Sequence, residues 1–270
     1  MLRALGTWGR RGGALPTREH AWLLPAPQQA RWRHFAQALG YPACAEPPLC
    51  FHYLALQRAQ MQAMLAADFP HPLPGIVHLA QRLERLRPWQ VAADGLLRLD
   101  WAEDRGPDGA LRLRMNASLE QGGQPSLRAS SLYLLRRGRR TAPGQPASPA
   151  PKPQPEPVPE PALERIATWV LPANAGRRHA WLTGDINPIH LWPWTARLFG
   201  RDRPIIHGMH SAARTEAELA RALGRPLSCL HIEFLKALTL PGTAHLVRHG
   251  TQGFALLDAT QTCVARGQYG

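Results

Sequence analysis

A proline-rich stretch near the middle of the chain limits its possible folds more than any other feature. Residues 141–161 read TAPGQPASPAPKPQPEPVPEP, with proline at nearly every second position. Proline fixes φ and lacks a backbone N–H, so the stretch favours extended polyproline conformation over a helix or a central strand. We interpret residues 141–162 as a semi-rigid linker that can reach on the order of 60 Å. The alternative is a polyproline ligand for a partner domain.

The linker leaves two units of domain size, residues 1–140 and residues 163–270. Hydrophobic residues make up 44% of the chain, which is enough for packed cores. We expect neither a membrane-spanning segment nor a secretory signal, because no apolar run has the required length. The sequence therefore predicts a cytoplasmic protein of two small units, the first with a helical extension at its N-terminus.

The formal charge of +13 comes almost entirely from arginine, since only Lys152 and Lys236 are lysines. The arginines are scattered and form no stripe interleaved with aromatic residues, so we expect no nucleic-acid partner. The chain has four cysteines, Cys44, Cys50, Cys229 and Cys263. None belongs to a C-x-x-C pair or lies near a histidine at metal-ligand spacing, so we expect reduced thiols and no metal site.

The second unit predicts a strand at 166–171, a loop, a buried helix and then an antiparallel meander. Apolar residues in 209–223 recur at i, i+3, i+4 and i+7, which indicates a helix with Gly224 as its C-terminal cap. Glu216 lies on the apolar face of this helix, so either it makes a buried hydrogen bond or the helix is rotated. The meander strands are expected at Cys229–Leu235, Thr243–Arg248 and Phe254–Ala265.

The first unit repeats this order loosely. Helices are expected at 29–39 and 51–66. Strands are expected at Leu73–Arg82, Gly95–Trp101, Ala110–Leu119 and Leu127–Leu135. Each half thus combines a helix with a meander, which indicates a duplicated α+β architecture.

The segment LTGDINPIH, residues 182–190, carries the groups best suited to catalysis. Asn187 followed by Pro188 is a helix-start signal. Asp185 precedes this cap and His190 falls in the first turn, so the break lets their side chains converge on one point. A carboxylate and an imidazole on one water perform general acid–base catalysis. The alternative is that Asp185 only caps a turn and His190 is a satisfied first-turn residue.

Residues 204–209, PIIHGM, open the alanine-rich helix. A helix N-terminus offers free N–H groups and partial positive charge, and glycine lets a ligand approach the backbone closely. The Gly208 N–H is therefore a candidate to stabilise a carbonyl oxygen that gains negative charge. The alternatives are that Gly208 is only a steric requirement and that Asn187 only caps its helix.

The string TGDINPIH at 183–190, followed after five residues by Ala196, resembles the hydratase motif of MaoC-like, (R)-specific enoyl-CoA hydratases. Residues 204–209 resemble the continuation of that motif, and the close resemblance covers about 180–213. A stretch at 69–78 resembles the first, degenerate unit of longer family members.

This resemblance implies an α+β double hotdog, in which each antiparallel sheet wraps around a long central helix. It implies reversible hydration of a trans-2-enoyl thioester to an (R)-3-hydroxyacyl thioester, with Asp185 and His190 holding the catalytic water. The residues implied to bind substrate are Asn187, Ile206, His207 and Gly208. No cofactor is implied, because coenzyme A or an acyl carrier protein is part of the substrate.

By the same resemblance, residues 163–270 form the catalytic unit and residues 1–140 a degenerate unit that walls the acyl cavity. His179 and Ala180 stand where the family usually has an aromatic residue, which leaves the cavity's shape in question. The arginines that could meet coenzyme A phosphates are Arg197, Arg201, Arg203 and Arg214. The alternatives are a hotdog thioesterase and a non-catalytic acyl-thioester-binding protein. The sequence leaves open whether the partner is acyl-CoA or acyl carrier protein, and whether a homodimer forms.

Overall fold

The protein is described by a computed structural model over residues 6–16, 19–135 and 164–270, so the predicted linker at 141–162 lies outside the described residues. The strands are β1 His20–Leu24, β2 Val77–Arg85, β3 Gly95–Arg105, β4 Leu111–Gln121, β5 Gln124–Leu134, β6 Glu164–Leu171, β7 Cys229–Phe234, β8 Gly242–His249, β9 Gly253–Asp258 and β10 Cys263–Tyr269. The helices are α2 Gln29–Leu39, α3 Leu49–Leu65, α4 Ala175–Thr183, the 3-10 helix η1 Pro188–His190, α5 Pro193–Arg197 and α6 Gly208–Leu223.

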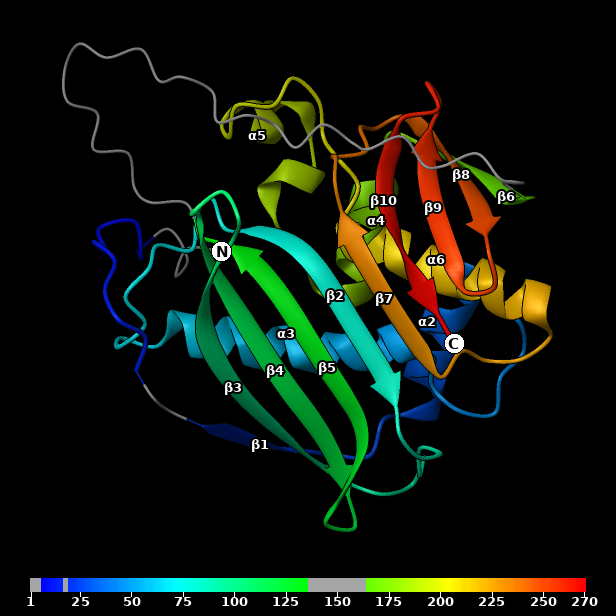
Figure 1. Cartoon of the computed structure of the whole chain (residues 1–270), viewed down its shortest axis with the longest axis horizontal. Coiled ribbons are helices and arrows are strands. Elements are labelled where there is room, and N and C mark those ends of the chain that lie inside the picture. The colour runs from blue at the N-terminus through cyan, green and yellow to red at the C-terminus, as the bar shows by residue number, and fades with distance from the viewer. Residues whose placement is uncertain (1–5, 17–18, 136–163) are drawn as a thin grey trace.

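The strands form one antiparallel sheet in the order β1-β3-β4-β5-β2-β7-β10-β9-β8-β6 (Figure 1). In the first half, β1 precedes α3 and β2 to β5; in the second half, β6 precedes α6 and β7 to β10. The strand orders β1-β3-β4-β5-β2 and β6-β8-β9-β10-β7 are equivalent, and in each half the first strand after the long helix pairs with the last strand. The halves join where β2 pairs with β7, with Leu83 opposite Leu230. This repeated topology, with one long helix behind each half-sheet, confirms the predicted duplicated α+β architecture and is a double hotdog.

Small side chains let α6 pack closely against its half of the sheet. Ala212, Ala213 and Ala217 on this helix are fully buried. Gly224 ends the helix in the left-handed conformation with φ of 66°, as predicted, because it carries no Cβ to clash there. The central helix α3 is buried on most of its circumference, so its few polar side chains must find partners inside the protein.

Glu216, the carboxylate on the apolar face of α6, makes the predicted buried hydrogen bonds, and the alternative of a rotated helix is wrong. Glu216 accepts hydrogen bonds from the Tyr41 hydroxyl at 2.7 Å and from the backbone N–H groups of Leu49 and Cys50 at 2.7 and 2.9 Å. Leu49 and Cys50 are the first residues of α3, whose N-terminal N–H groups lack partners within the helix. A side chain of the second half therefore caps the central helix of the first half.

Replacing Glu216 with Ala is expected to lower the free energy of unfolding by about 3 kcal/mol, because two buried N–H groups and one hydroxyl lose their acceptor. Urea denaturation followed by circular dichroism measures the change. Glu218→Ala is the matched control on the same helix. Its partly exposed carboxylate pairs with the side chains of Arg214 and Arg221 and caps no helix, so its loss should cost clearly less than the loss of Glu216. Equal losses in the two variants would contradict the capping role.

The predicted strand Phe254–Ala265 is wrong as a single element, because it contains a tight turn. Asp258 accepts hydrogen bonds from the backbone N–H groups of Thr260 and Thr262 at 2.9 and 3.0 Å. Gln261 in this turn has φ of 60°. An Asp that bonds the backbone two residues ahead reverses the chain, so the run becomes β9 and β10.

The sequence pattern predicts neither β1 nor α4, and it places the start of β2 too early. The chain turns just before β2, where the Ile76 N–H donates to the Leu73 carbonyl at 3.1 Å. The other predicted elements agree with the structure to within a few residues. No helix in the described part of the chain is long and apolar enough to cross a membrane.

Candidate active site

The segment at 183–190 has the local structure that its residues predict. Helix α4 ends at Gly184, whose φ is 84°. The Asn187 side chain accepts a hydrogen bond from the Ile189 N–H at 3.3 Å, and Pro188 occupies the first position of η1. As expected, this cap starts a new short helix between Asp185 and His190, so the two residues do not lie on one continuous helix. The Asn187 side chain is exposed and acts here as the cap.

The geometry of His190 fixes its protonation state. Its Nδ1 lies 2.8 Å from the backbone oxygen of Ile205, and a carbonyl oxygen can only accept, so Nδ1 carries a hydrogen. Burial, followed by the neighbouring His207, lowers the pKa of His190 well below its usual range. The ring is therefore neutral near pH 7. Its Nε2 then carries a free lone pair and can accept a proton or hold a water.

His207 brings the two motif residues together. It immediately precedes α6 and is only 2% exposed. Its ring stacks on that of His190 with centroids 3.7 Å apart. Its Nε2 donates to the backbone oxygen of Asp185 at 3.0 Å and lies 4.0 Å from the Asp185 carboxylate oxygen Oδ2. Asp185 and His190 thus both contact the ring of His207 at the start of α6.

The Asp185 carboxylate has a partner in the first half of the molecule. Its Oδ2 accepts a hydrogen bond from Nε2 of Gln57, on α3, at 2.7 Å. The Asp185 side chain is 26% exposed, so it remains accessible to a small molecule. Sequence reasoning misses Gln57. The available signal is the spacing of Tyr53, Gln57 and Gln60, which places three polar side chains on one side of an apolar helix.

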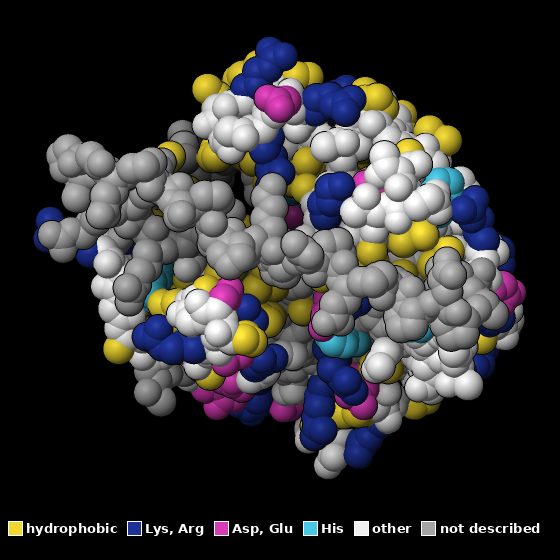
Figure 2. All heavy atoms as spheres, turned by 45° about the horizontal axis from the view of Figure 1, so that its top comes forward, with side chains coloured by type: hydrophobic (Ala, Val, Ile, Leu, Met, Phe, Trp, Pro, Cys, Tyr) yellow, Lys and Arg dark blue, Asp and Glu magenta, His cyan; other side chains and the backbone are white. Residues whose placement is uncertain are grey.

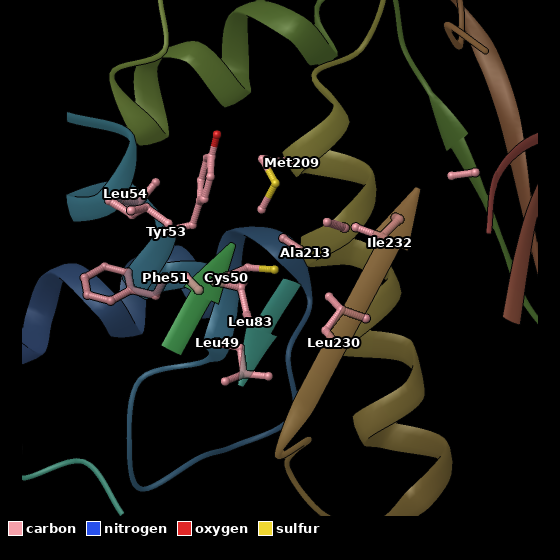
Figure 3. Packing of buried hydrophobic residues seen from close by; sticks show 14 of the residues in the cluster. Leu49, Cys50, Phe51, Tyr53, Leu54, Leu83, Met209, Ala213, Leu230 and Ile232 are labelled. Atoms are coloured by element: carbon pink, nitrogen blue, oxygen red, sulfur yellow. The ribbon is translucent and has the colours of Figure 1, made fainter. Parts of the chain in front are cut away.

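A buried polar chain continues from this side of α3 into the sheet. The hydroxyls of Tyr53 and Tyr133 are 3.4 Å apart, and the Tyr133 hydroxyl donates to Gln60 at 2.7 Å. Burial raises the pKa of Tyr133 to about 12, so it keeps its proton at neutral pH. Figure 3 shows the Tyr53 hydroxyl pointing away from Leu49 and Leu83, which belong to the buried hydrophobic core. The first half therefore contributes polar groups near the motif as well as apolar packing.

The residues at the start of α6 have packing roles of their own. A Cβ on Gly208 would lie 3.0 Å from the ring of Phe234, so a larger residue here would fit only if that ring shifted slightly. The Gly208 N–H donates no backbone hydrogen bond within the described residues, which leaves it available to a ligand. Ile206 is buried and its N–H donates to Leu238 at 2.9 Å.

Two further histidines, His179 and His210, extend this group of rings. The ring centroid of His179 is 4.8 Å from that of His207 and 5.2 Å from that of His210. Burial lowers the pKa of His179 well below its usual range and that of His210 to about 3, so both are neutral. Among the described residues, no group of three or more His, Cys, Asp or Glu side chains is arranged to hold a metal ion.

The surface around the motif is apolar and arginine-rich. Trp181, Trp194 and Leu198 are 72%, 64% and 74% exposed. Figure 2 shows hydrophobic and Lys or Arg side chains together at the top of the view, where α5 lies. The exposed arginines here are Arg197, Arg201 and Arg203. Arg214 is engaged elsewhere, because it donates to Leu39 and Glu218. Two hollows of about 490 and 430 Å³ lie on the first half and include no motif residue.

Comparison with known proteins finds similar sequences and similar folds. Residues 154–248 match the family model described as MaoC like domain. The 3-hydroxyacyl-thioester dehydratase X of Mycobacterium tuberculosis is 28% identical over 234 residues, 86% of this chain and 80% of that protein. The crystal structure of HtdX from M. tuberculosis has a TM-score of 0.73 at 22% identity, covering 93% of this chain and 99% of that one. A MaoC-like dehydratase from Phytophthora capsici has a TM-score of 0.68 at 16% identity, covering 95% and 96%.

Proposed function

We propose that this chain, whose residues 154–248 match the MaoC like domain model, is a hydro-lyase that interconverts trans-2-enoyl and (R)-3-hydroxyacyl thioesters. One observation carries the proposal. The Asp185 backbone and the His190 ring are held on the same buried His207 at the start of α6, with Nε2 of His190 unprotonated. The relative that is 28% identical, a 3-hydroxyacyl-thioester dehydratase, supports the same chemistry.

In the hydration direction, Asp185 and His190 hold a water over the double bond. One of the two bases takes a proton from the water as its oxygen bonds to C3 of the enoyl group. The C2=C3 electron pair moves toward the thioester carbonyl, whose oxygen gains negative charge and accepts the Gly208 N–H. The base then returns the proton to C2, so the atoms of one water add across the double bond. Dehydration is the reverse.

The proposed reaction needs no cofactor, because the thioester itself acidifies the α-carbon and the protein supplies proton transfer and charge stabilisation. The substrate carrier is coenzyme A or an acyl carrier protein. The exposed residues Arg197, Arg201 and Arg203 near the motif are suited to phosphate groups, which both carriers present to the protein. Arg214 is excluded from this role by its hydrogen bonds to Leu39 and Glu218.

The test is a direct assay of the purified full chain on trans-2-enoyl thioesters of several chain lengths, each on coenzyme A and on an acyl carrier protein. We expect loss of the enoyl-thioester absorbance without release of free thiol, and a product that chiral chromatography identifies as (R). Release of free thiol would identify a thioesterase instead. Binding without turnover of any substrate would leave the non-catalytic alternative and defeat the proposal.

A further inference from the structure

We infer that Gln57, on α3 of the first half, is a positioning residue for the Asp185 carboxylate in the proposed reaction. The inference rests on the proposed function and adds a residue that the motif does not contain. It also gives the first half, which has no Asp–His string of its own, a direct part in the active site. One site is then built from both halves of the molecule.

The hydrogen bonds of Asp185 show how its carboxylate is oriented. Gln57 Nε2 donates to Oδ2 at 2.7 Å, and among the described residues this is the carboxylate's hydrogen bond to a side chain. The nearby His207 nitrogen donates to the Asp185 backbone oxygen and is 4.0 Å from Oδ2, too far for a second hydrogen bond. With Oδ2 occupied, Oδ1 is the oxygen left to hold the catalytic water. The Gln57 amide therefore selects the base atom and fixes its direction.

The helix that carries Gln57 is a rigid support. Gln57 lies one turn after Tyr53, which is 3% exposed, and three residues before Gln60, which is 1% exposed. Gln60 donates to Ser131 at 2.8 Å and accepts from Tyr133 at 2.7 Å. These bonds fix the rotation of α3 about its axis. Since the N-terminus of α3 is capped by Glu216 of α6, the position of the Gln57 amide follows from both halves.

The amide orients the carboxylate without neutralising it. Gln57 is uncharged, so it supplies no counter-charge that would hold the carboxylate away from the water. Loss of the donor should therefore slow the chemical step, but it should leave thioester binding nearly unchanged.

The test compares Gln57→Met with Gln62→Met in the full-length protein. Met matches the length of Gln without a donor, and Gln62 is an exposed residue of the same helix. With crotonyl-CoA as the probe, we expect Gln57→Met to lower kcat about 10- to 100-fold with KM within about twofold, the loss of one charged hydrogen bond. Gln62→Met should match the wild type. A Gln57→Met enzyme with kcat within about twofold of the wild type would overturn the inference.

A second variant separates positioning from a purely structural tie between the halves. Gln57→Glu places two carboxyl groups at hydrogen-bond distance, and such a pair holds one proton between them. We expect the acid limb of its kcat/KM profile to move up by more than about one pH unit, with activity partly recovered at high pH. An unmoved acid limb would overturn the inference. If the wild type itself hydrates no enoyl thioester, both the proposed function and the role of Gln57 are wrong. If the wild type is active and the Gln57 variants behave like it, the role of Gln57 is wrong and the proposed function stands.

Discussion

Asp185→Asn is expected to lower kcat/KM for hydration of crotonyl-CoA by about 10²- to 10⁴-fold, the usual contribution of a general base. Asn has the size of Asp and can still fill the site beside Gln57 and His207. It has no negative charge and cannot take a proton from water. Because the Asp185 side chain is 26% exposed and, among the described residues, makes one hydrogen bond to a side chain, the melting temperature should change by only a few degrees.

His190→Asn is expected to cause a loss of the same size, about 10²- to 10⁴-fold. The choice of Asn follows from the structure. Its side-chain NH₂ can replace Nδ1 as the donor to Ile205, whereas no atom replaces Nε2. His190→Ala would be a poorer test, because it removes a buried ring that stacks on His207 and leaves the Ile205 carbonyl without its donor.

The double variant tests whether the two residues act as a unit. If both hold the same water, the loss in Asp185→Asn/His190→Asn should be close to that of either single variant, far less than the product of the two. Steady-state kinetics on all four proteins, with circular dichroism as the check on folding, measures this. Well-folded single variants that keep wild-type activity would rule out the pair as the catalytic groups.

Acid is expected to unfold the protein near pH 5, because several histidines are buried in the neutral form. Burial lowers the pKa of His52 to about 3, that of His78 to about 4 and that of His210 to about 3, against an ordinary value of 6.5. In the unfolded chain these rings take up protons below pH 6.5, and in the folded protein they do not. Stability is therefore fully present above pH 6.5 and falls as the pH drops toward the folded pKa values.

The size of the effect follows from linkage. At pH 5 each of the three buried rings lowers the free energy of unfolding by about 2 kcal/mol, and together they lower it by about 6 kcal/mol. A domain is typically stable by about 5–15 kcal/mol, so this loss alone can reach the unfolding transition. His179 and His190, whose pKa values burial also lowers, add to it.

The measurement is urea denaturation at pH 7.5, 6.5, 5.5 and 5.0. His52→Phe should flatten the slope of stability against pH by about 1.4 kcal/mol per pH unit below pH 6.5, because it removes one of the buried rings. Its ring can pack against Trp89 as that of His52 does, tilted at 55° with centroids 4.4 Å apart. His34→Gln, at an exposed position of α2, is the control and should leave the slope unchanged. A wild type equally stable at pH 7.5 and pH 5.0 would contradict the prediction.

The sequence by itself determined the local structure of the site. Asn187 and Pro188 specify the short helix that separates Asp185 from His190, because capping and a fixed φ act within a few residues. The same holds for α6, whose apolar period and terminal Gly224 define its length. The similar order of helix and strands in the two halves also indicated the duplicated sheet.

Only the tertiary structure decided which groups complete the site. Gln57 meets Asp185 across 128 positions of the chain, and the backbone of Leu49 meets Glu216 across 167. These contacts depend on the pairing of β2 with β7, which places α3 and α6 in contact with each other. Periodicity and capping report which face of a helix is buried, but not which distant residue it faces, because that choice is made by packing between elements.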